Sequence, residues 1–109
     1  MSTVSQRISW LKDRVKARGL IESAFSRTKV IGYSHLCTFI FTGRCGNSDL
    51  SVLCKDFEEL QLKQLPTDHH NFMKVMQFTS FTNSDDVHVC VNHSAEGEVI
   101  SVTLQYLGE

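Results

Sequence analysis

The stretch VHVCVNHSAEGEVISVTLQYL, residues 87–107, decides the fold class of this chain. Val87, Val89 and Val91 alternate with polar residues, and a polar loop over residues 92–98 separates them from a second alternating segment. Strict alternation places apolar side chains on one face of a half-buried strand, so the stretch predicts an antiparallel hairpin. In the second strand the apolar face is expected to hold Ile100, Val102, Leu104 and Tyr106. One face of the sheet should pack on helices, and the other should meet solvent or a partner.

Two segments upstream of this hairpin predict further strands. Residues 30–42, VIGYSHLCTFIFT, carry many β-branched and aromatic residues on both alternating faces, which is typical of an interior strand, and we expect it at the centre of the sheet. Residues 71–81, NFMKVMQFTSF, predict another strand with Phe72, Met76 and Phe78 on one face. Together with the hairpin, these segments predict an antiparallel sheet of about four strands.

The N-terminal region predicts an amphipathic helix rich in basic residues. Thr3 and Gln6 are spaced as in a helix-capping box, and apolar residues then recur at helical spacings. Gly19 favours a bend that ends the helix, whereas the apolar residues after it could continue the helix as a second short piece. Those residues are Leu20, Ile21, Ala24 and Phe25. We expect residues 1–28 to form a basic helical region.

A second, short helix is predicted over residues 49–64. Its apolar residues recur at helical spacings, and Pro66 follows the segment. They are Leu50, Leu53, Phe57 and Leu60. A short strand over residues 50–54 is the alternative, because that sequence also fits an extended segment. The expected fold is one α+β domain, residues 1–109, in which residues 29–109 form a mixed, sheet-rich body packed with the N-terminal helix and the second helix.

Composition favours an intracellular protein that does not contact a membrane. The 109 residues are 41% hydrophobic and 21% charged, as in an ordinary globular domain. No apolar run approaches the roughly 20 residues that cross a bilayer. The first ten residues, MSTVSQRISW, lack the apolar segment of a secretory signal.

The net charge of −1 hides an asymmetry along the chain. Residues 1–29 carry seven basic and two acidic residues, whereas the remaining residues carry four basic and ten acidic ones. Such a basic end can bind a nucleic acid or an acidic membrane surface, can join two protomers through opposite charges, or can be a solvated helix face. The candidate RNA-binding residues are Arg7, Lys12, Arg14, Lys16 and Arg18.

The apolar stripe of the same helix suggests a different function. The stripe consists of Val4, Ile8, Leu11 and Val15. A second copy could pair with it, which predicts a homodimeric protein-interaction adaptor that does not bind RNA.

A zinc site is a further hypothesis. Cys90 and His93 are two intervening residues apart, so both can reach one Zn²⁺ ion at a hairpin tip. A tetrahedral site needs two more ligands from Cys45, Cys54, His69, His70 and His88, of which Cys45 and Cys54 are preferred as thiolates. The alternative is that Cys90 is a buried small apolar residue and His93 a loop residue.

The sequence offers weak support for catalysis, and we expect a protein that is not an enzyme. His35 and Cys37 share a strand face, but in an apolar strand such a pair usually serves packing. A doubled histidine at residues 69–70 and a doubled glutamate at residues 58–59 are typical of exposed surface. A metal-assisted hydrolase that uses the Cys and His groups remains the alternative from another class.

Two short stretches resemble a known family. Residues 30–41, VIGYSHLCTFIF, resemble the Gly-Tyr-Thr-His strand near the start of the sobemovirus first-reading-frame proteins, which are small plant-virus suppressors of RNA silencing needed for systemic spread. Residues 89–93, VCVNH, resemble the first half of a zinc finger in a longer member, with histidine in place of cysteine, but no second pair follows. The resemblance implies a viral virulence factor in the host cytoplasm that suppresses RNA silencing by binding RNA or a host protein.

Overall fold

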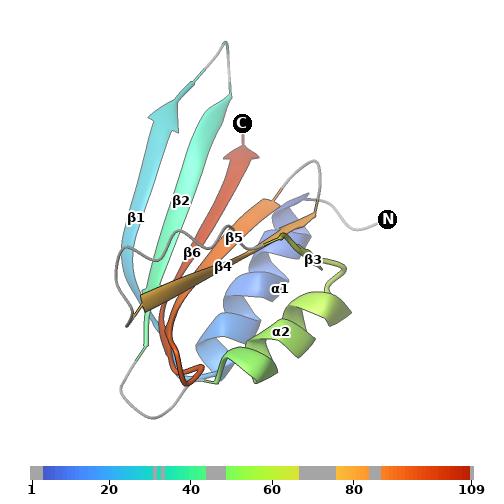
Figure 1. Cartoon of the computed structure of the whole chain (residues 1–109). Helices are drawn as coiled ribbons and strands as arrows, with labels where there is room; N and C mark the ends of the chain where they lie inside the picture. Colours follow the sequence, from blue (N-terminus) through green and yellow to red (C-terminus); the bar gives the residue numbers. More distant parts are fainter. Residues whose placement is uncertain are drawn as a thin grey trace.

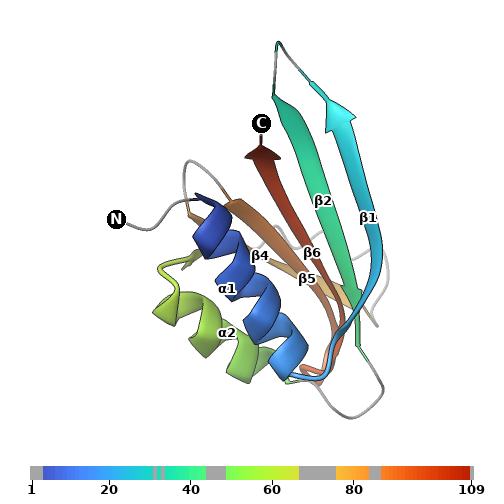
Figure 2. The same ribbon diagram turned by 180° about the vertical axis from the view of Figure 1, so that it is seen from behind.

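The computed structural model describes residues 4–30, 32, 34–43, 49–66, 76–83 and 87–108. Within these segments the chain forms two helices and a six-stranded antiparallel sheet, with both helices on the same face of the sheet (Figures 1 and 2). The elements are α1 (Val4–Ala17), β1 (Ile21–Lys29), β2 (His35–Thr42), α2 (Leu50–Glu59), β3 (Lys63–Gln64), β4 (Met76–Asn83), β5 (Val87–Ser94) and β6 (Val99–Gly108). The predicted α+β class is confirmed. A helix long and apolar enough to cross a bilayer is not found in the described segments.

The strands are ordered β1-β2-β6-β5-β4-β3, and every neighbouring pair is antiparallel. β5 and β6 form the predicted hairpin and lie in the middle of the sheet. β2 is an interior strand, but it lies between β1 and β6, second from one edge, so the prediction that it forms the centre is wrong. The prediction of about four strands is too low, because β1 and β3 add two more at the edges.

The prediction of a helical region over residues 1–28 is corrected by β1. α1 ends at Ala17, and Gly19 follows in the left-handed region at φ 88°. The Leu20 N–H donates to the carbonyl of Val15 and the Gly19 N–H donates to that of Lys16, which is the hydrogen-bond pattern of a Schellman motif. The chain therefore leaves the helix sharply, and the next nine residues pair with β2 as an edge strand. Thr3 of the predicted capping box lies outside the described residues.

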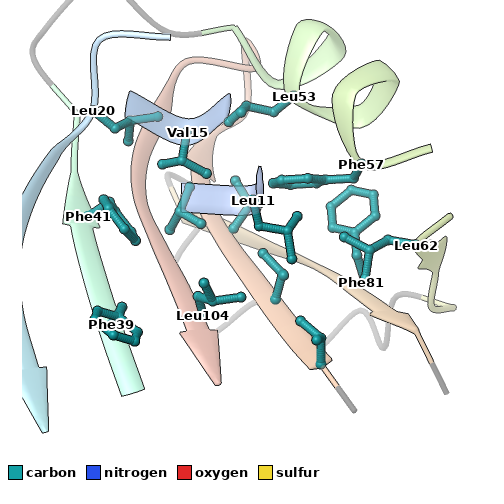
Figure 3. Packing of buried hydrophobic residues seen from close by; sticks show 14 of the residues in the cluster. Leu11, Val15, Leu20, Phe39, Phe41, Leu53, Phe57, Leu62, Phe81 and Leu104 are labelled. Carbon is teal, nitrogen blue, oxygen red and sulfur yellow. The ribbon is translucent and has the colours of Figure 1, made fainter. Parts of the chain in front are cut away.

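The hydrophobic core lies between the helices and the sheet (Figure 3). α1 contributes its predicted apolar stripe, of which the described members are buried: Ile8, Leu11 and Val15. α2 adds Leu53 and Phe57, and the Phe57 ring meets that of Phe81 on β4 at 5.0 Å between centroids, edge to face. Valine and leucine side chains of β5 and β6 close the core from the sheet.

α2 is the predicted second helix, although it is shorter than residues 49–64. Asp49 caps it, because its Oδ1 accepts from the Ser51 N–H at 2.8 Å and from the Ser51 hydroxyl at 2.8 Å. The hydrogen bond from the Ser51 hydroxyl, and to a smaller extent that from the Ser51 N–H, lowers the pKa of Asp49 below its ordinary value. The helix ends at Glu59, and a positive φ of 65° at Gln61 turns the chain into the short strand β3. The alternative strand over residues 50–54 is not formed.

The pleat of the hairpin differs from the prediction at one end. The register shifts after Asn92, so that His93 pairs with Val99. Val99 is buried and Ile100 is 38% exposed, because the irregularity moves Ile100 out of the apolar face that it was predicted to share with Val102. In the predicted strand 71–81, Phe78 is exposed, Phe72 lies outside the described residues and the side chain of Met76 is not described.

The side of the sheet away from the helices, here called the open side, has an uncharged composition. In β1, β2, β4, β5 and β6 the register assigns no Lys, Arg, Asp or Glu of the described chain to this side, because directly paired residues of antiparallel strands point the same way. The residues on this side are Ile21, Ala24, Ser26, Thr28, Leu36, Thr38, Ile40, Thr42, Phe78, Ser80, Thr82, His88, Cys90, Asn92, Ser94, Ser101, Thr103, Gln105 and Leu107. The charged side chains of β1 therefore belong to the helix side of the sheet.

Candidate nucleic-acid interface

One flank of α1 binds the rest of the domain through arginines. Asp56 of α2, 2% exposed, accepts from Arg18 Nε at 2.7 Å, from Arg18 Nη2 at 2.9 Å and from Arg14 Nη1 at 2.9 Å. The hydrogen bond from Arg18 is the main cause that lowers the pKa of Asp56, although burial alone would raise it. Arg14 also reaches Glu59 at 3.1 Å. Two of the five predicted RNA-binding residues thus hold α2 against α1.

Arg7 lies on the same flank and contacts β4. With the Asn83 side-chain amide oriented to accept, its oxygen lies 2.6 Å from Arg7 Nη1 and 3.1 Å from Arg7 Nε. A third predicted RNA-binding residue is therefore engaged within the chain. The arginine flank, defined as Arg7, Arg14 and Arg18, is a set of structural contacts.

The opposite flank of α1 faces strands β1 and β2. Lys12 Nζ lies 4.0 Å from the centroid of the Phe39 ring, a cation–π contact with a β2 residue. Lys16 Nζ lies 3.8 Å from Glu22 Oε2 on β1. The two lysines among the predicted RNA-binding residues therefore border the paired strands β1 and β2, which we call the arm. In Figures 1 and 2 the arm reaches beyond the ends of both helices.

The arm presents further cations to this same side. Arg27 pairs with Cys37, and Lys29 pairs with His35. Because paired residues point the same way and Cys37 is buried on the helix side, Arg27 and Lys29 also point to the helix side. Arg27 Nη2 lies 3.3 Å from His35 Nδ1. Glu22 is the single acidic residue among the described residues of β1 and β2.

Aromatic rings lie beside these cations. The Phe25 and Phe39 ring centroids are 4.6 Å apart with an angle of 36° between the planes. Phe39 and Tyr106 of β6 are nearly parallel, at 7° and 6.1 Å between centroids. Phe25 is 53% exposed, whereas Phe39 is 9% exposed. Burial is the main cause that raises the pKa of Tyr106, and the charge and hydrogen bond of Cys37 add to it. The Tyr106 hydroxyl is therefore neutral at pH 7.

We call this the basic–aromatic surface; it consists of Lys12, Lys16, Phe25, Arg27, Lys29 and His35. Its two helical lysines were predicted from the sequence. Phe25, Arg27 and Lys29 were not, because the apolar residues over positions 20–25 also fit a continuation of the helix. The alternation of large and small residues from Phe25 to Lys29 was the available signal for a strand.

The described side chains of the predicted dimerisation stripe do not lie on the surface. Ile8, Leu11 and Val15 are between 1% and 5% exposed and face the core of their own chain, where a second copy cannot reach them. The side chain of Val4 is not described.

The structure does not bring together the predicted zinc ligands that it describes, Cys54, Cys90 and His93. His93 is 4% exposed; its Nε2 lies 2.7 Å from Thr79 Oγ1 and its Nδ1 lies 2.9 Å from the Ser94 carbonyl oxygen, so both nitrogens have partners in the chain. Cys90 points to the open side, away from the core that holds His93. Cys54 is half-buried on α2, and burial raises the pKa of its thiol; Cys45 lies outside the described residues. Within the described segments no three Cys, His, Asp or Glu side chains gather as metal ligands.

The candidate catalytic pair on β2 is not arranged as a nucleophile and its base. Cys37 is buried, and its thiol donates to the backbone oxygen of His35 at 4.0 Å. The His35 ring contacts Arg27, which is a cation and not an orienting carboxylate. The histidines at residues 69–70 lie outside the described part of the chain.

Comparisons with protein-family models, with curated proteins and with solved structures gave no match.

Proposed function

We propose that this chain binds RNA through the basic–aromatic surface and that, as a virulence factor of a plant virus, it suppresses host RNA silencing and aids systemic spread by this binding. The observation that carries the proposal is that four cationic side chains from α1 and β1 lie on one side of the arm, with one carboxylate among them. The protein acts by occupying RNA and not by turnover.

Electrostatics favours this surface over the others. RNA affinity comes largely from neutralised phosphates, so an RNA-binding surface needs clustered cations. Among the described residues, the five longer strands place no lysine or arginine on the open side. The helix α2 carries the acidic residues Asp56, Glu58 and Glu59. The acidic body would repel phosphates, and RNA contact is therefore confined to the arm and to the lysine flank of α1.

RNA is favoured over a host protein as the partner by the mixture of side chains. Lysine and arginine beside an exposed phenylalanine suit a ligand that has both phosphates and flat bases. The resemblance of residues 30–41 to sobemovirus silencing suppressors supports RNA silencing as the process concerned.

A titration of labelled single-stranded RNA, followed by fluorescence anisotropy at several salt concentrations, tests the proposal. Four phosphate contacts predict a slope of about −2.8 for log K against log salt. In the variant Lys12→Ala/Lys29→Ala the slope should be shallower, about −1.4, because two phosphate contacts are lost.

The matched control is Lys55→Ala/Lys63→Ala, which removes the same charge from exposed positions on α2 and β3. It should bind RNA nearly as the unchanged protein does. If the control weakens binding as much as the test variant does, or if no salt-dependent binding is found, the proposal fails. In leaves that express a silenced reporter gene, the test variant should restore less reporter signal than the control.

A further inference from the structure

Phe25 is an unusual residue for its position. It lies on the edge strand β1, whose nine residues are all exposed, and 53% of its surface is open. Edge strands are usually protected by charged or small side chains, and an exposed large aromatic residue costs solubility. Core packing needs only part of this ring, so the exposed part is available for a ligand.

The ring is supported from behind by other rings. One side of Phe25 contacts Phe39, at 4.6 Å between centroids. Phe39 in turn contacts Tyr106, nearly parallel at 6.1 Å between centroids, and the ammonium group of Lys12, 4.0 Å from the centroid of its ring. A flat side chain with a packed support behind it loses little conformational entropy when a second flat group stacks on it.

Cations lie at intervals along the same strand face. Arg27 and Lys29 are two and four residues beyond Phe25, or roughly 7 and 13 Å along a strand. A base stacked on Phe25 would therefore have cations within reach of the phosphates that follow it in the same RNA strand. This spacing links the aromatic ring and the charges into one site.

We propose that Phe25 is the stacking site for an unpaired base, and that the basic–aromatic surface consequently binds single-stranded RNA in preference to duplex RNA. This inference rests on the RNA binding proposed above. In a duplex the bases stack on one another and their faces are inaccessible, whereas unpaired bases stack readily on aromatic side chains.

The test compares Phe25→Leu with the unchanged protein on a single-stranded RNA and on a blunt duplex of the same sequence. Leucine keeps an apolar contact with Phe39 but removes the flat face. Loss of one stacked base predicts single-strand binding weaker by about 5- to 100-fold, with little change for the duplex. The control Phe78→Leu replaces an equally exposed ring, 56% open, on the open side and should leave both affinities unchanged.

Phe25→Trp keeps a flat ring and should bind single-stranded RNA at least as tightly as the unchanged protein. If Phe25→Leu unfolds, as thermal unfolding would show, weaker binding by Phe25→Trp would overturn the inference and retained binding would support it. Unchanged single-strand affinity of folded Phe25→Leu, or equal affinity of the unchanged protein for the duplex, would refute the stacking site while RNA binding stands. If neither RNA binds the unchanged protein, the proposed function fails as well.

Discussion

Replacement of Asp56 by asparagine should destabilise the domain by about 2–3 kcal/mol. The Asp56 carboxylate is buried and accepts three charge-assisted hydrogen bonds, at 2.7, 2.9 and 2.9 Å, from Arg14 and Arg18. Each such bond contributes roughly 1.5–3 kcal/mol when a charged group takes part. The side chains of the two arginines are 43% and 39% exposed and can recover hydration, which keeps the net loss well below the sum of three bonds.

The assay is thermal unfolding at pH 7, where a loss of this size lowers Tm by roughly 10–15 °C for a domain of this length. The control Glu58→Gln removes an exposed carboxylate from the same helix and should change the free energy of unfolding by less than about 0.5 kcal/mol. If Asp56→Asn melts as the control does, the ion pairs contribute no stability and the structural role of Arg14 and Arg18 is refuted.

Acid provides an independent check on the same carboxylate. Hydrogen bonding from Arg18 lowers the folded-state pKa of Asp56 below the unfolded value, which is about 3.9. The stability that Asp56 contributes is therefore complete above that unfolded value and is lost as the pH falls through the lower folded pKa. The difference in the free energy of unfolding between the unchanged protein and Asp56→Asn should become smaller as the pH falls below about 4. A constant difference down to pH 2 would contradict this account.

Two further predictions concern the core. Leu11→Ala should lower the free energy of unfolding, measured in urea, by about 2–5 kcal/mol, because Leu11 is 1% exposed. The urea midpoint of the unchanged protein should not depend on protein concentration. A midpoint that depends on concentration would favour pairing of α1 between two copies. Thr79→Val should cost about 1–3 kcal/mol, because it removes the hydrogen-bond partner at 2.7 Å from the buried His93 Nε2; unchanged stability would show that this bond contributes nothing.

Elements with a local pattern were predictable from the sequence. α1, α2 and the β5–β6 hairpin each repeat apolar residues with the period of their own structure, and each is present. β1 was missed because apolar residues at positions 20, 21, 24 and 25 also fit a helix. Pairing with β2 along the whole strand decides between helix and strand for this segment. That pairing joins residues up to 21 positions apart, which no local sequence pattern shows.

The site was predictable in part, for the same reason. Lys12 and Lys16 could be named from charge alone, but their surroundings could not. Phe25 and Phe39 meet only through the register of β1 and β2, fourteen residues apart in the chain. Tyr106 joins them from the opposite end of the sequence. A charge pattern thus indicates which residues can bind phosphate, and strand pairing decides which of them lie beside aromatic rings.

The two flanks of α1 show why a count of basic residues does not measure RNA binding. Arg14 and Arg18 lie 42 and 38 residues from Asp56 in sequence, so the carboxylate that neutralises them is not visible in the helix itself. Replacement of these arginines would lower stability, and any loss of RNA binding would follow from unfolding. Under the proposed function, Lys12 and Lys29 contact phosphates, and their replacement would lower RNA affinity in a folded protein. One helix can therefore combine a stabilising flank with a binding flank, and only measurements of stability and affinity on the same variants separate the two roles.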